Sequence, residues 1–142
     1  MEKTRENLKE GGRESSPLSR KIILLIGNSA PLRGFLRLTL MGALPEVVVR
    51  EAQDDAQVLS ELTHQWIDLI FLDMDIPTLD ARALLRMIHG DPRLARKPVV
   101  ALAGRITPEL LREFKGDRAV WFIEKPAQAE EVTEVVWRFL GQ

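Results

Sequence analysis

Five short apolar runs alternate with five helical patterns along this chain, and that alternation restricts the fold more than any other feature of the sequence. The runs lie at 22–26, 47–49, 69–72, 99–102 and 119–123. The first is continuously apolar, as a strand buried on both faces should be. Alternation of strands and helices predicts an α/β fold: a parallel sheet with right-handed crossovers and helices on both of its faces.

The helical patterns begin at residues that suit a helix start, such as capping Asp or Thr and first-turn Pro. We expect helices from Pro31 to about Gly42, from Asp54 or Asp55 through Leu62, from Asp80 to about Gly90, from Thr107 through Phe114, and over 129–140. Residues 20–142 are therefore predicted to form one domain. Residues 1–19 mix charge, glycine and serine, and they are predicted to form a flexible N-terminal tail.

Composition excludes several classes of function. The chain has 142 residues, no cysteine and a formal net charge of −1. Disulfides, thiolate metal sites and cysteine nucleophiles are therefore excluded, and no bulk positive field draws in nucleic acid or anionic lipid. The sequence has neither an apolar run of membrane-spanning length nor the apolar core of a signal peptide. We expect a cytoplasmic protein that binds neither nucleic acid nor membrane.

Asp73 is the most informative single residue. It ends the third apolar run, and a carboxylate at the carboxyl end of a central strand lies where α/β sheets place ligands and chemistry. The loops after the first and fourth strands should complete that site. The first loop, 27–31, contains no acid, and the second, 102–104, contains no hydroxyl. The site around Asp73 is therefore expected to hold few polar groups.

Three stretches of the chain resemble one known family. Residues 68–80 resemble the phosphoacceptor segment of response-regulator receiver domains, the CheY-like family of two-component signalling. Glu124-Lys125-Pro126 is similar to the lysine–proline motif of that family, and 91–100 is similar to its approach to the fourth strand. The resemblance covers about residues 21 to 140. It implies a doubly wound, flavodoxin-like sheet of five parallel strands in the order 2-1-3-4-5.

The resemblance also implies roles for individual residues. Asp73 matches the phosphoacceptor, and Lys125 matches the lysine that pairs with the phosphoryl group. Phe122 matches the aromatic residue that follows the conformational switch, and the Lys125–Pro126 bond is expected to be cis. Phosphorylation in the family comes from a histidine kinase.

The chain departs from the family where the site needs charge and a hydroxyl. Asn28 and Ser29 stand at the positions of two acids that help bind Mg²⁺, and Ala103 stands at the position of the switch Thr or Ser. Asn28, Ser29, Asp73 and Asp75 together form a degenerate set of metal positions. We therefore expect no cofactor and weak Mg²⁺ binding at most. With the acids gone, Lys125 is expected to form a direct salt bridge with Asp73.

Two tryptophans indicate a binding surface. Trp137 falls on the outer side of the last helix, and tryptophan is enriched at interface hot spots. Trp121 lies on the neighbouring fifth strand. In the receiver family the surface of helix 4, strand 5 and helix 5 is the usual partner and dimer face. We therefore expect a signalling protein or a second copy of the chain to bind there. The alternative is that one or both tryptophans pack over the sheet edge or cover a helix.

The sequence as a whole predicts an atypical, stand-alone receiver domain, or pseudo-receiver, that acts in bacterial signalling by phosphorylation-independent protein–protein interaction. No effector domain is expected, because the chain ends after the fifth helix. No nucleophile–base pair or phosphate-binding glycine loop is evident, so an enzyme is not expected. One alternative is a working single-domain response regulator phosphorylated on Asp73. Another is a small-ligand sensor that uses the pocket near Asn28, Ser29 and Ala103.

Overall fold

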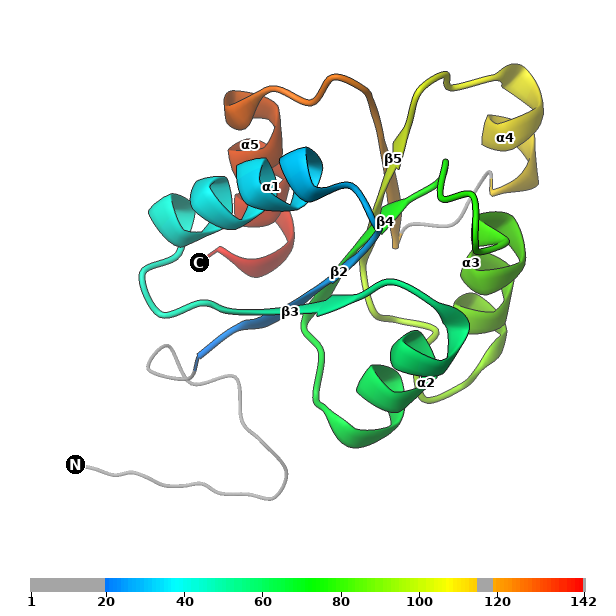
Figure 1. The fold of residues 1–142 in the computed structure, drawn as a ribbon, viewed down its shortest axis with the longest axis horizontal. Helices are drawn as coiled ribbons and strands as arrows, with labels where there is room; N and C mark the ends of the chain where they lie inside the picture. The colour runs from blue at the N-terminus through cyan, green and yellow to red at the C-terminus, as the bar shows by residue number, and fades with distance from the viewer. Residues whose placement is uncertain (1–19, 115–118, 142) are drawn as a thin grey trace.

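Five strands alternate with five helices in the computed structural model, which describes residues 20–114 and 119–141 (Figure 1). The elements are β2 (Ile22–Ile26), α1 (Ala30–Ala43), β3 (Val48–Ala52), α2 (Asp55–His64), β4 (Leu69–Asp73), α3 (Ala81–Gly90), β5 (Val99–Ala103), α4 (Pro108–Glu113), β6 (Val120–Glu124) and α5 (Ala129–Leu140). The predicted tail at 1–19 lies outside the described residues. None of the helices within the described residues is long and apolar enough to cross a membrane.

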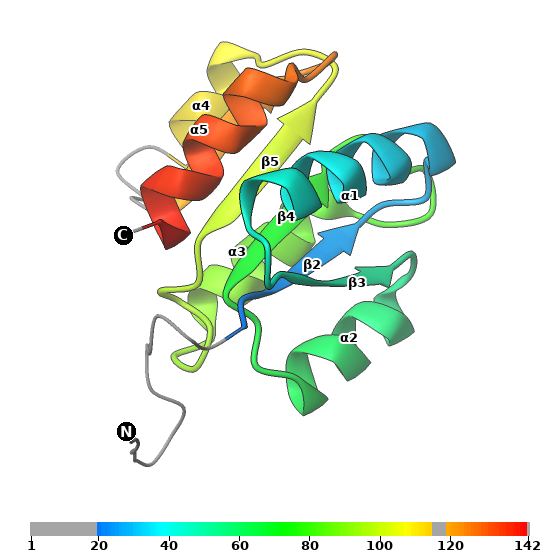
Figure 2. The same ribbon diagram turned by 90° about the vertical axis from the view of Figure 1, so that its left-hand side faces the viewer.

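The strands form one parallel sheet in the order β3-β2-β4-β5-β6. Numbered along the chain this is the order 2-1-3-4-5, so the predicted fold class is confirmed. β4 is the central strand, with β2 on one side and β5 on the other. All the strands point the same way, so the loops that follow β2, β4, β5 and β6 meet at one edge of the sheet (Figures 1 and 2).

Helices cover both faces of the sheet. Figure 2 shows α1 and α5 on one face, and α2, α3 and α4 cover the other. Successive residues of β4 alternate between the two layers: Leu69 and Phe71 pack under α1 and α5, and Ile70 and Leu72 pack on the opposite side. All five residues of β4 are buried. This two-sided burial explains why the sequence shows a continuous apolar run there.

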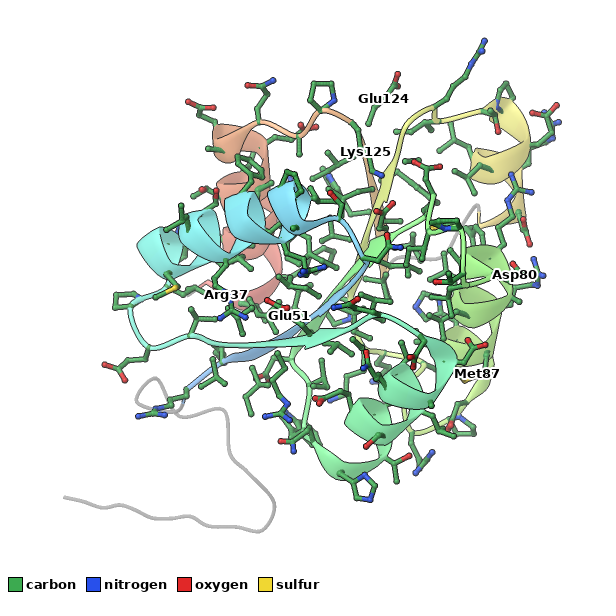
Figure 3. All side chains as sticks on the ribbon, viewed as in Figure 1. Arg37, Glu51, Asp80, Met87, Glu124 and Lys125 are labelled. Atoms are coloured by element: carbon green, nitrogen blue, oxygen red, sulfur yellow. The ribbon has the colours of Figure 1, made fainter. Side chains whose placement is uncertain are left out.

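The second strand differs from its prediction. It runs over Val48–Ala52 and not over 47–49, so it includes two charged residues. β3 is an edge strand, and its charged side chains find partners on the neighbouring helices. Arg50 donates to Glu61 of α2 at 2.9 Å, and Glu51 accepts from Arg37 of α1 at 2.6 Å, a pair that Figure 3 labels. An apolar pattern alone misses a strand whose polar side chains are paired in this way.

Four helices begin at a side chain that caps the first turn. The N-caps are Ser29, Asp54, Asp80 and Thr107, and each accepts a hydrogen bond from a backbone N–H three residues later. Asp54, and not Asp55, therefore caps α2. The cap also fixes where α1 begins, directly after the first loop of the site.

Candidate functional site

Asp73 is a buried carboxylate at the carboxyl end of β4. The residue is 5% exposed, and it is the one buried polar or charged residue among the described residues. Gly27, which follows β2, packs against it: a Cβ at Gly27 would lie only 3.2 Å from the Asp73 Cβ. Glycine at 27 therefore leaves room for the Asp73 side chain between the ends of two neighbouring strands.

Lys125 supplies the counter-charge for Asp73. Its ammonium Nζ donates to Asp73 Oδ1 at 2.6 Å, and the backbone N–H of Asp75 donates to the same oxygen at 2.9 Å. The Lys125 backbone N–H donates to the Ala103 carbonyl at 2.8 Å, which holds the residue at the end of β6. The Lys125–Pro126 bond is cis, as expected. Figure 3 shows Lys125 at this edge of the sheet, with its neighbour Glu124 directed outward. The ion pair predicted from the sequence is present.

Asp75 adds a second carboxylate to the same ammonium. Its Oδ2 lies 3.2 Å from Lys125 Nζ and accepts a hydrogen bond of 2.6 Å from the Gly104 backbone N–H. Partial burial disfavours the charged form of Lys125. The hydrogen bonds to Asp73 and Asp75 outweigh that effect, so the pKa of Lys125 is raised above its ordinary value of 10.5. Three loops, those after β4, β5 and β6, are therefore joined through one charged group.

The remaining predicted positions contribute no charge. Ser29 Oγ accepts from the Leu32 N–H at 3.3 Å as the N-cap of α1, so its hydroxyl is engaged by the helix. Asn28 is exposed in the loop before it. Ala103 is 2% exposed, and its methyl group belongs to the apolar layer beneath α2, α3 and α4. Within residues 20–114 and 119–141, no group of three or more His, Cys, Asp or Glu side chains that could hold a metal ion is found.

The family of this chain follows from its similarity to known proteins. The model of the response regulator receiver domain matches residues 23–137. The chain belongs to the response-regulator receiver family. Its match to this family places the receiver domain in two-component signal transduction. The order of the five strands and the position of Asp73 at the end of the central strand agree with that assignment.

Relatives among the curated proteins support the same family. The receiver domain is 30% identical over 94 residues to a gliding motility regulatory protein of Myxococcus xanthus, covering 66% of this chain and 12% of that protein. It is 29% identical over 107 residues to stress response regulator protein 1 of Meyerozyma guilliermondii, covering 75% of this chain and 49% of the relative. The chain thus spans less than half the length of either curated relative.

A solved structure shows the same fold. The receiver domain of a DNA-binding response regulator from Colwellia psychrerythraea superposes with a TM-score of 0.78 at 19% identity, covering 86% of this chain and 99% of that one. At this identity the likeness describes the fold alone.

The aromatic candidates lie around β6 of the receiver domain. Phe122 faces the layer of α4, with its ring centroid 6.3 Å from that of Phe114. Trp121, one residue earlier, faces the opposite layer, where it is partly buried and lies under the Arg138 guanidinium at 4.7 Å. Trp137 on α5 is 47% exposed. Only Trp137 of the two predicted interface tryptophans therefore presents a large exposed surface.

The hydrogen bond between Asp75 and Gly104 is the part of the site that sequence reasoning missed. From the sequence, Asp75 is expected only to be one of the degenerate metal positions. Its carboxylate instead reaches a backbone amide 29 positions later in the chain. The sequence signal for this contact is an acid after the third strand together with a glycine after the fourth. In the structure a Cβ at Gly104 would lie 3.3 Å from Asp75 Oδ2, so glycine allows the close approach.

Proposed function

We propose that this receiver domain acts in signal transduction through protein–protein contacts that do not depend on phosphorylation of Asp73. The observation that carries the proposal is the closed ion pair: Lys125 donates to Asp73 at 2.6 Å, while the neighbouring positions Asn28 and Ser29 are neutral. A pair of this kind holds one arrangement of the site. The protein then presents a constant surface to its partner.

Mg²⁺, which the family implies, does not fit the donor set of this site. The ion needs several oxygen ligands in near-octahedral geometry. The two carboxylates, Asp73 and Asp75, already share the Lys125 ammonium, and the Ser29 hydroxyl caps α1. A divalent ion would have to displace Lys125 and would meet one neutral amide at Asn28 in place of an acid. We infer weak Mg²⁺ binding at most, and no other cofactor.

The change at Ala103 supports the same proposal independently. A methyl group cannot follow a phosphoryl group by hydrogen bonding, and Ala103 is buried in the apolar layer that also contains Phe122. A charge placed on Asp73 would therefore have no hydroxyl through which to act on β5 and the surface beyond it. Lacking that link, the two ends of the switch are uncoupled.

The proposed partner surface is formed by α4, β6 and α5. β6 is an edge strand, with α4 packed on one face and α5 on the other. Each helix exposes one large apolar side chain, Leu111 at 49% and Trp137 at 47%. Exposed tryptophan is costly in water and well suited to an interface anchor. The partner is a second copy of the chain or another signalling protein.

Substitution of Trp137 tests the proposed surface. Trp137→Ala is expected to weaken self-association in sedimentation, or capture of a signalling partner, at least tenfold, which corresponds to about 1.4 kcal/mol. Trp66→Ala is the matched control, because Trp66 is also exposed, at 54%, but follows α2, which is not one of the elements of the proposed surface. Equal effects of the two substitutions, or no effect of Trp137→Ala, would contradict the proposal.

The two alternative functions make different demands on the site. A working phosphoacceptor is favoured by the retained Asp73–Lys125 geometry, and it requires Mg²⁺-dependent modification that Asp73→Asn abolishes.

A ligand sensor requires space. The cavity directly behind Asp73 measures about 10 Å³, roughly one water molecule. A wider hollow of about 540 Å³ lies beside it, lined by Ser29, Pro31, Leu32, Phe35, Lys125, Pro126 and Ala127. A small molecule that co-purifies with the protein would favour the sensor.

A further inference from the structure

A cavity of about 140 Å³ lies at the end of the sheet opposite Asp73. One wall comes from the end of α2 and the segment between α2 and β4, and the other from the loop between α3 and β5. Three buried apolar side chains line it, those of Leu62, Ile67 and Leu94. The cavity shares no residue with the site around Asp73.

The loop between α3 and β5 holds its shape through its own hydrogen bonds. The Leu94 N–H donates to the Asp91 carbonyl at 2.8 Å, and the Lys97 N–H donates to the Leu94 carbonyl at 2.9 Å. The Arg93 N–H donates to Asp91 Oδ1 at 2.9 Å. This wall of the cavity is therefore already formed, and a ligand that binds there orders little of the chain.

Trp66 joins the two walls. Its indole Nε1–H donates to Asp68 Oδ1 at 3.0 Å, and Asp68 Oδ2 accepts from the Ile22 N–H at 2.8 Å. Lys97 Nζ lies 3.4 Å from the centroid of the Trp66 ring, a cation–π contact between the walls. The indole is thus held in one orientation although it is 54% exposed.

Both charged residues that line the cavity, Arg93 and Lys97, are cations. Asp91 pairs with the Arg93 guanidinium at 3.1 Å and offsets part of its charge, so Lys97 is the main group for an anion. The neighbouring carboxylates, Asp91 and Asp68, are not among the lining residues. An apolar pocket with a few placed polar groups is typical of a small-molecule site, and here the charged groups select an acid.

We propose that this cavity binds a small organic carboxylate, whose apolar part lies against Leu62, Ile67 and Leu94 and whose carboxylate pairs with Lys97. The volume sets the size of the ligand: an apolar cavity of about 150 Å³ holds one benzene molecule. The apolar part is therefore about one six-membered ring. The inference goes beyond the proposed protein–protein function and does not depend on it, because α4, β6 and α5 contribute no residue to the cavity.

An NMR titration with benzoate, at constant pH and ionic strength, tests the proposal. Saturable shifts are expected at the Trp66 indole N–H and at the Leu94 and Lys97 amides, and none at Gly104, which follows β5 at the other end of the sheet. Benzamide keeps the shape without the charge, and acetate keeps the charge without the ring. Each should bind at least about tenfold more weakly than benzoate.

Two variants test the role of Lys97. Lys97→Met keeps an apolar stem and removes the charge, so its affinity for benzoate should fall at least about tenfold while its affinity for benzamide is unchanged. Lys21→Met is the matched control, because it removes a lysine directly before β2, at the same end of the sheet but outside the cavity. It should bind benzoate as the unsubstituted protein does.

The three ligands are compared on the unsubstituted protein, so the result stays decisive even where Lys97→Met fails to fold. The proposal is overturned if benzoate gives no saturable shift at Trp66 and Leu94, or if acetate or benzamide binds as tightly as benzoate. Equal losses of benzoate affinity in Lys97→Met and Lys21→Met would also overturn it.

Discussion

Lys125 Nζ lies 2.6 Å from Asp73 Oδ1, so the end of the edge strand β6 is joined to the end of the central strand β4 by a charged hydrogen bond. The two partners differ in their surroundings. The Asp73 side chain is 6% exposed, whereas that of Lys125 is 26% exposed and also contacts Asp75. Loss of one partner therefore has a different consequence from loss of the other.

Substituting Lys125 should destabilise the domain more than substituting Asp73. Lys125→Met leaves the buried carboxylate of Asp73 without its counter-charge, and we expect a loss of about 1–3 kcal/mol in the free energy of unfolding. Asp73→Asn removes the buried charge while Lys125 keeps Asp75, so its cost should be under about 1 kcal/mol. Chemical denaturation measures both. In the double variant the losses should not add, and additive losses would show that the pair is not coupled.

Alkaline pH should weaken the fold through Lys125. Burial disfavours its charge, but the hydrogen bonds to Asp73 and Asp75 prevail and raise its pKa above 10.5. The folded state therefore holds this proton more tightly than the unfolded state. The stabilisation is complete below pH 10.5 and is lost as pH rises through the folded-state pKa. Unfolding free energies measured on both sides of that pH should fall more steeply in the unsubstituted protein than in Asp73→Asn/Asp75→Asn. Equal slopes would contradict this account.

Two glycine-to-alanine substitutions should change the stability of the domain in opposite directions. At Gly27 a Cβ would lie 3.2 Å from the Asp73 Cβ, between two strand ends that cannot easily separate. Gly27→Ala is therefore expected to cost about 1–3 kcal/mol. Gly34 lies inside α1 with nothing within 4 Å of its Cβ position, so Gly34→Ala should stabilise the domain by about 1 kcal/mol. Thermal unfolding of both variants checks the pair, and a neutral Gly27→Ala would show that the contact relaxes.

Ser29 should behave as a helix cap. Ser29→Ala removes the acceptor for the Leu32 N–H and should cost about 1 kcal/mol. Ser29→Asp restores a capping oxygen and adds the first acid to the N-terminal turn of α1, which has none, so it should be neutral or stabilising. The denaturation midpoints of both variants, compared with that of the unsubstituted protein, check these two expectations. If Ser29→Ala were silent, the cap would contribute nothing and the residue would be free for another role.

Much of the fold could be predicted from the sequence because burial on both faces leaves a continuous apolar run. Leu69 to Leu72 and Val99 to Leu102 lie in strands that are buried throughout, and both runs mark their strands closely. The edge strand β3 was misplaced, because Arg50 and Glu51 are satisfied by ion pairs that reach across from α2 and α1. Such pairings join residues far apart in sequence and leave no periodic signal.

The candidate site, like the fold, could be predicted from the sequence only in part. The pairing of Asp73 with Lys125 is expected from the family resemblance, and the parallel topology brings the carboxyl ends of β4, β5 and β6 to the same edge of the sheet. The contact between Asp75 and the Gly104 amide could not be predicted, since it depends on the direction in which one loop side chain turns. The partial burial of Trp121 under Arg138 was likewise hidden, because a strand residue beside an edge can face either layer.

The central claim, that Asp73 belongs to a fixed ion pair and not to a phosphorylation switch, is tested most directly by an amide NMR titration with Mg²⁺ followed by beryllofluoride, a mimic of the phosphoryl group. At millimolar Mg²⁺ the account predicts no shifts at Asp73, at Phe122 or along α5. Asn28→Asp/Ser29→Asp, which restores both acids, is the positive control and should respond near Asp73. Shifts in the unsubstituted protein that begin at Asp73 and extend to Phe122 and α5 would contradict the account.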